Sequence, residues 1–133
     1  METTMDIPET TRTIARRVKE LRTRQGITAE QLAHLLSGQG IHWDRFAVAN
    51  LEKERRKNLT VGEMLALARV LHVSPVHLIV PPTNEGTFQV TPEEACPPSD
   101  ARAWIRGSAE LPRTDRRIFR TEVPFSELGQ SWA

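Results

Sequence analysis

The fold is decided by TAEQLAHLLSGQGIHWDRFAVANLEKERRK, which spans residues 28–57. The stretch begins with Thr28, and Gln31 follows three positions later, which is the arrangement of a capping box at the start of a helix. Leucines then recur with helical spacing, and Gly38 is a natural stop. We therefore expect a short helix over residues 28–37, with an apolar face made of Leu32, Leu35 and Leu36.

A second helix is expected after the turn SGQGIHW, which has two glycines and no periodicity. We expect Ile41 or Trp43 to reach the core from this turn. Asp44 can cap the helix, which should run to about Glu54, and the charged segment ERRKN after it is expected to be a loop. Helical spacing gives this helix an inner face of Ala47, Val48 and Leu51 and an outer face of Arg45, Phe46, Ala49, Asn50 and Lys53.

Three more helices are predicted around these two. Apolar residues at helical spacing indicate one helix over residues 8–25. A second capping box, Thr60 with Glu63, begins the most hydrophobic helix of the chain. Ser74 and Pro75 begin a short fifth helix, which Pro81 must end because proline has no amide hydrogen. The sequence thus predicts an all-α, five-helix domain over residues 8–80.

The composition changes after the prolines, and residues 83–133 are expected to form a short mixed C-terminal arm. TFQV and RIFRTEV are interpreted as extended strands, and SDARAWIRG as a two-turn helix. Three aromatic residues indicate that part of the arm packs against something: Phe88, Trp104 and Phe119.

The totals fit one domain with an extension. The chain has 133 residues, of which 38% are hydrophobic and 26% charged, values typical of a water-soluble protein. No apolar run is long enough to span a membrane, and the polar N-terminus does not have the order of a secretory signal. The single cysteine, Cys96, cannot form an internal disulfide. We expect a cytoplasmic protein.

The small net charge of +1 hides an uneven distribution. Residues 1–80 carry twelve Lys and Arg against nine Asp and Glu, whereas residues 83–133 carry six against eight. The cations of the N-terminal part form two clusters, the first within residues 12–24 and the second within residues 53–57, which indicates a local anionic partner. Within the first cluster, Arg12, Arg16 and Arg17 are interpreted as a solvated helix face.

The two central helices and their turn have the layout of a helix-turn-helix, whose second helix lies in the major groove of DNA. Arginine can bond guanine, asparagine can bond adenine, and an aromatic ring or alanine can contact a thymine methyl group. We therefore predict that Arg45, Phe46, Ala49 and Asn50 read bases. For Phe46 the alternative is that the ring packs under Trp43.

Contacts with the DNA backbone are expected at two places. The start of the first central helix can hold a phosphate through its amides, the helix dipole and a hydroxyl group, which assigns Thr28, Ala29 and Gln31. Cations at and after the end of the second helix can neutralise phosphates and supply the salt-dependent part of the affinity. These cations are Lys53, Arg55, Arg56 and Lys57.

Three segments together resemble the Cro/C1-type helix-turn-helix family of repressors, also called the XRE family, which has the lambda-repressor-like fold. They are VKELRTRQGITAEQLAHLL, AVANLEKERR and LTVGEMLALARVLHVSPVHLI, and the resemblance covers roughly residues 10–80. It implies that Arg22 and Glu52 form a structural ion pair. The chain departs from the family pattern in its longer turn, in Ala29 where many members have a glutamine that contacts DNA, and in Glu54 where a glycine is usual. With Glu54 in place of that glycine, the alternative to a loop is that the helix continues towards Asn58.

By this resemblance we expect a repressor that binds double-stranded operator DNA as a homodimer, such as a temperate-phage immunity repressor or a small actinobacterial regulator. Apolar groups that would otherwise be exposed are assigned to the dimer contact: Val76, Ile79, Val80 and Trp104. The alternative is a protein-binding module, such as an antitoxin or coactivator, whose arm holds a partner.

Other classes of function have no motif to support them. The sequence has no glycine-rich phosphate loop, no nucleophile elbow and no zinc-protease motif, so no catalytic residue and no enzyme activity are predicted. Its four histidines and one cysteine do not have metal-site spacing, so no metal and no cofactor are expected.

Overall fold

The structure of the protein is a computed structural model that describes residues 8–128. The chain divides between Pro81 and Pro82 into two compact units, and each is described by itself. The first unit contains all five expected helices: α1 (Glu9–Arg24), α2 (Ala29–Ser37), α3 (Arg45–Glu52), α4 (Val61–Val70) and α5 (Pro75–Ile79). The expected fold class, an all-α five-helix domain followed by a short mixed segment, is confirmed.

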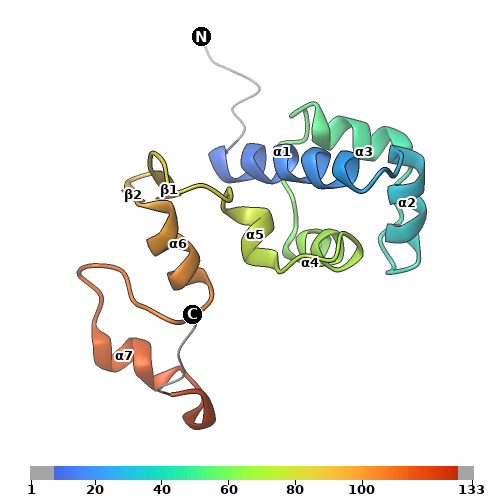
Figure 1. The fold of residues 1–133 in the computed structure, drawn as a ribbon. Coiled ribbons are helices and arrows are strands. Elements are labelled where there is room, and N and C mark those ends of the chain that lie inside the picture. Colours follow the sequence, from blue (N-terminus) through green and yellow to red (C-terminus); the bar gives the residue numbers. More distant parts are fainter. Residues whose placement is uncertain (1–7, 129–133) are drawn as a thin grey trace. The chain divides into compact units, whose positions relative to one another are not determined.

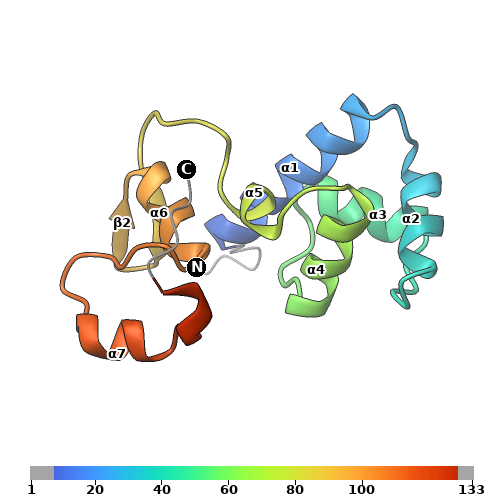
Figure 2. The same cartoon turned by 60° about the horizontal axis from the view of Figure 1, so that its bottom comes forward.

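The five helices enclose one core (Figures 1 and 2). Helix α1 packs against α3 and α5, α2 packs against α3 and α4, and α4 packs against α5. The most deeply buried side chains come from all five helices and include Val18, Leu32, Leu36, Val48, Leu51, Leu67, Leu71 and Leu78. Ile41 and Trp43, from the turn between α2 and α3, are partly buried against this core.

Side-chain caps explain where the helices begin. At α2 the Thr28 hydroxyl accepts a hydrogen bond from the Gln31 amide at 3.0 Å, and the Gln31 side chain accepts one from the Thr28 amide at 2.8 Å. The same reciprocal pair starts α4 at Thr60 and Glu63. At α3 an Asp44 carboxylate oxygen accepts from the Ala47 amide at 2.9 Å. The predicted caps at these three helices are thus present.

Helix α3 ends earlier than its sequence predicted. It stops at Glu52, and Glu54 adopts a left-handed backbone conformation with φ of 59°. The Glu54 amide donates to the Leu51 carbonyl and the Arg55 amide donates to the Asn50 carbonyl, which together form a Schellman motif. The alternative in which Glu54 prolongs the helix is therefore wrong, because Glu54 occupies the conformation that glycine usually supplies. Residues 55–60 form the expected loop.

The second unit begins with an antiparallel hairpin of β1 (Phe88–Thr91) and β2 (Glu94–Cys96), in which Phe88 lies opposite Cys96. Helix α6 (Pro98–Ile105) follows and contacts β1. The predicted strand RIFRTEV is instead helix α7 (Arg116–Thr121), because the Asp115 carboxylate caps the Ile118 amide at 3.1 Å. A 3-10 turn at Phe125–Glu127 ends the described chain.

Residues 8–128 contain neither a membrane-spanning helix nor a metal-binding group of side chains. None of the helices there is both long enough and apolar enough to cross a bilayer. That part of the chain also lacks any group of three or more histidine, cysteine, aspartate or glutamate side chains that could hold a metal ion.

Candidate nucleic-acid interface

Helix α3 has one fully buried face and one exposed face. Val48 and Leu51 are completely buried in the core and fix the helix from inside. On the outer side Arg45, Asn50 and Lys53 are exposed, Phe46 is 63% exposed, and Ala49 is half-buried between the two faces. The predicted base-reading residues therefore share one surface.

The polar groups of this surface have no partners inside the described chain. Arg45, Asn50 and Lys53 form no side-chain hydrogen bond or ion pair with any residue between 8 and 128. The Arg45 guanidinium carbon lies 4.9 Å from the centroid of the Phe46 ring. The alternative in which Phe46 packs under Trp43 does not occur, because the ring faces solvent beside Arg45.

The position of α3 depends on a carboxylate in another helix. One Glu63 oxygen accepts hydrogen bonds from Trp43 Nε1 at 3.3 Å and from Arg56 at 2.7 Å, and the other caps the Thr60 amide at 2.9 Å. The Arg56 guanidinium carbon also lies 4.6 Å from the Trp43 ring. Trp43 precedes α3 and Arg56 follows it, so Glu63 ties both ends of the helix to α4.

The contacts with Glu63 and Trp43 distinguish Arg56 from the neighbouring cations Arg55 and Lys57. Arg56 also donates to the Asn58 carbonyl at 2.9 Å, so its guanidinium is engaged on several sides. Arg55 and Lys57 are exposed, and neither forms a side-chain hydrogen bond or ion pair among the residues that the structure describes. The sequence assigned all of these cations to phosphate contacts and gave no signal that one of them is structural.

The start of α2 offers fewer free groups than its sequence indicated. The Thr28 hydroxyl and the Gln31 side chain are both used in the capping box, which also occupies the Gln31 amide. The amides of Ala29 and Glu30 lie in the first turn, where a helix has no internal partners for them. The Glu30 carboxylate is in the same turn, which makes this end of α2 less attractive to an anion.

Arg22 and Glu52 form the ion pair that the family resemblance implies. The pair is bidentate, with Nε–Oε2 and Nη2–Oε1 distances of 2.7 and 2.8 Å, and the Arg22 Nη1 donates to the Ile27 carbonyl at 2.9 Å. The Glu52 side chain is only 7% exposed. Hydrogen bonding to Glu52 raises the pKa of Arg22 above its ordinary value, although partial burial works against this shift. The pair fastens the end of α3 to α1.

Known structures provide a comparison for this arrangement. The chain is 32% identical to the restriction-modification controller protein C.AhdI from Aeromonas hydrophila, over 51% of this chain and 94% of that one, with a TM-score of 0.44. It is 24% identical to a hypothetical transcription factor, NHTF, from Neisseria, over 58% of this chain and 85% of that one, with a TM-score of 0.49. Neither the protein-family models nor the curated proteins include a match.

The first comparison covers nearly the whole controller protein at 32% identity. The chain belongs to the Cro/C1-type helix-turn-helix family. This assignment rests on that identity and coverage, and the helix order and the Arg22–Glu52 pair of the first unit agree with it. The family predicted from the sequence is confirmed.

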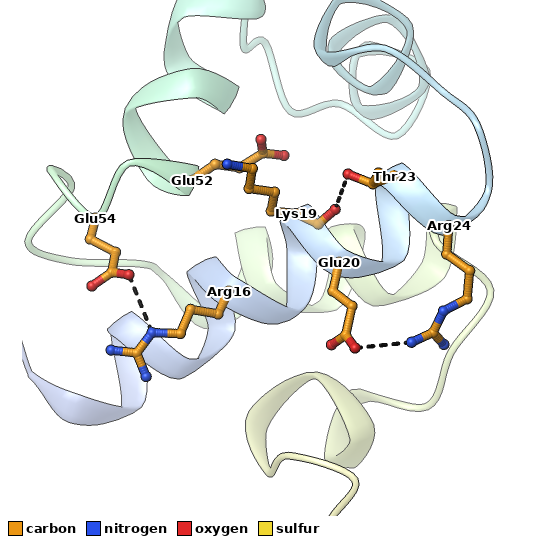
Figure 3. Close-up of a pocket in the computed structure, with 7 residues that line it drawn as sticks. All are labelled: Arg16, Lys19, Glu20, Thr23, Arg24, Glu52 and Glu54. Carbon is orange, nitrogen blue, oxygen red and sulfur yellow. Dashed lines mark hydrogen bonds and ion pairs between the residues drawn. The ribbon is translucent and has the colours of Figure 1, made fainter.

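The first basic cluster of this Cro/C1-type domain is mostly neutralised by acidic side chains. Figure 3 shows Arg16 paired with Glu54 and Arg24 paired with Glu20 in a shallow hollow beside α1. The hollow is lined by the neutral Thr23 and by charged side chains of both signs: Arg16, Lys19, Glu20, Arg24, Glu52 and Glu54. Such a balance does not favour an anionic ligand.

Arg17 differs from the expectation of a solvated helix face. It is 6% exposed, its Nε donates to the His77 carbonyl at 2.9 Å, and its guanidinium pairs with Glu20. This prediction was wrong for Arg17, which joins α1 to α5.

The residues assigned to a dimer contact have different surroundings. Val76 is 3% exposed and Val80 is fully buried within the chain, whereas Ile79 and Trp104 are half-buried. The premise that these groups would remain exposed is therefore wrong for Val76 and Val80. Exposed large apolar side chains occur elsewhere, at Leu35, Phe46, Val61, Leu65, Ile118, Phe125 and Leu128.

Proposed function

We propose that the protein is a cytoplasmic, sequence-specific transcriptional regulator that binds double-stranded DNA with α3 in the major groove. The observation that carries the proposal is the exposed face of α3, where Arg45, Asn50 and Lys53 have no partners among the described residues while the opposite face is fully buried. Polar groups held on a rigid helix, with unpaired cations in the loop that follows, are suited to base edges and phosphates.

In its finer form the proposal is a repressor that occupies an operator as a homodimer, as an immunity repressor of a temperate phage would. Two copies of α3 would then meet successive major grooves about 34 Å apart. The dimer contact is proposed to include the half-buried Ile79 and Trp104. Light scattering after size exclusion, and a reporter gene placed behind the selected site, test these two parts separately.

The main test is selection of bound sites from a random pool of duplex DNA by the full chain, followed by gel-shift titration. Arg45→Ala and Asn50→Ala should reduce the preference for the selected site over random DNA by about 1–3 kcal/mol each. Arg55→Ala should weaken binding to both DNAs alike and lower the salt slope by about one. Failure to enrich any site, together with unchanged binding by all three variants, would overturn the proposal.

One observation favours a second candidate, a module that binds a protein partner. The end of the second unit exposes Ile118 at 66% and Phe125 at 89%, and neither α7 nor the 3-10 turn has a buried residue. If Phe125→Ser abolished regulation in cells and left the affinity for the selected site unchanged, partner binding would be the principal task. If it changed neither, this candidate would be excluded for that surface.

A further inference from the structure

Arg45 and Phe46, the first two residues of α3, form a cation–π pair on its exposed face. The Arg45 guanidinium carbon lies 4.9 Å from the Phe46 ring centroid, within the range of a cation–π contact. The ring is 63% exposed and belongs to no part of the buried core. Packing of the domain therefore does not account for a phenylalanine at this position.

Stacking prepares the arginine for a planar partner. The donors of a guanidinium lie in its own plane, so a ring that covers one face leaves the hydrogen-bonding edges free. Contact with the ring also restricts the side-chain conformations of Arg45 before binding. Less conformational entropy is therefore lost when Arg45 binds a ligand. Arg45 is thus partly ordered before it meets a ligand, although it has no polar partner among residues 8–128.

The dimensions of B-DNA determine what the ring would then meet. An arginine that bonds O6 and N7 of guanine lies at the level of that base pair. Successive base pairs are separated by about 3.4 Å, so a ring whose centroid lies 4.9 Å from the guanidinium carbon extends beyond the level of that base pair towards a neighbouring one. The apolar group that a base presents in the major groove is the C5-methyl group of thymine.

We propose that Arg45 and Phe46 act as one reading unit for a two-base-pair step in which guanine adjoins thymine. Arg45 bonds the guanine edge, and the Phe46 ring covers the thymine methyl group while it holds the guanidinium in place. This inference rests on the proposed DNA-binding function and specifies part of its ligand. It predicts that each half-site selected from random DNA contains such a step.

The test changes single atoms of the selected site and uses the full-length chain. Deoxyuridine in place of the thymine removes only the methyl group and should weaken binding about fourfold, the value of one buried methyl-sized group. The same replacement should have no effect on Phe46→Ala. Likewise, 7-deazaguanine removes the N7 acceptor and should weaken the wild type at least about fivefold but leave Arg45→Ala unchanged.

Asn50→Ala is the matched control, because it lies on the same face and should keep the full deoxyuridine effect. Circular dichroism should show Phe46→Ala folded, since the ring is outside the core. If deoxyuridine lowered the affinity of wild type and Phe46→Ala equally, the proposal of a paired reader would be overturned. Selected sites without a guanine–thymine step would overturn it too. Either result would leave the proposed function standing, whereas the absence of any selected site would overturn that function itself.

Discussion

Helices α3 and α7 are both short and both expose large side chains, but they are held in different ways. Helix α3 buries Val48 and Leu51 completely, and it is fastened to α1 by Glu52. Helix α7 has no buried residue, and the only cap at its start is Asp115. A helix of this length is not stable without packing. Exposure alone therefore does not identify a binding surface: the exposed face of α3 lies opposite a buried inner face, whereas α7 has no buried residue.

The largest expected difference between these helices comes from truncating one apolar side chain in each. Leu51→Ala should lower the free energy of unfolding by about 2–5 kcal/mol, because it leaves a cavity in a closed core. Ile118→Ala, at 66% exposure, should change it by less than about 0.5 kcal/mol. Urea denaturation followed by circular dichroism measures both. Similar losses would mean that the face of α7 is covered in solution, and the contrast with α3 would be lost.

Two ion pairs provide the next test, because the pair with the shorter N–O distance should contribute less to the free energy of unfolding. Glu52→Gln leaves the mostly buried Arg22 guanidinium without its counter-charge and should cost about 3 kcal/mol. Glu110→Gln breaks the 2.6 Å pair with Arg116, whose side chain is 67% exposed, and should lower stability much less because solvent screens this pair. Thermal midpoints of the two variants give the order. The reverse order would show that distance matters more here than burial.

Most of the first unit could be predicted from its sequence, because local signals and packing agree there. The capping boxes at Thr28 and Thr60 and the apolar spacing of the helices fix where the elements lie. The second unit was harder, because short segments of apolar and charged residues suit a strand or a helix equally. A single cap at Asp115 decided in favour of a helix.

The candidate site could be predicted only in part. The face of α3 follows from helical periodicity, so Arg45 and Asn50 were placed correctly on one surface. The role of Arg56 does not follow, because Glu63 and Trp43 come from separate elements and meet it only in the folded chain. The burial of Arg17 depends in the same way on the His77 carbonyl of another helix.

Two adjacent arginines allow a sharper test of how α3 is held. Arg56→Ala removes the ion pair with Glu63 and the contact with Trp43, and it should lower the free energy of unfolding by about 1–2 kcal/mol. Arg55→Ala should leave stability within about 0.5 kcal/mol of wild type while weakening DNA binding. Denaturation and salt-dependent gel shifts separate the two roles. Equal stability of both variants would show that the network around Glu63 does not position the helix.

The smallest effect is expected where each unit places a residue other than glycine in a left-handed conformation. Glu54 has φ of 59° and Arg113 has φ of 64°. This conformation costs about 1–2 kcal/mol for a residue with a Cβ atom, and the exposed ion pair of Glu54 with Arg16 recovers little of that cost. Glu54→Gly should therefore raise the free energy of unfolding by about 0.5–1 kcal/mol, part of the relief being offset by the greater freedom of glycine in the unfolded chain.

Glu54→Ala separates backbone strain from charge, because it removes the carboxylate and keeps the strain, and it should be slightly less stable than wild type. The same pair of variants at Arg113 extends the measurement to the second unit. If the two units unfold independently, Arg113→Gly should raise the midpoint only of the transition in which the second unit, with α6, unfolds. Glu54→Gly should raise only the midpoint for the first unit, with α3. A single transition moved equally by both variants would show that the units unfold together, and the difference between α3 and α7 would then be one of local packing within one cooperative protein.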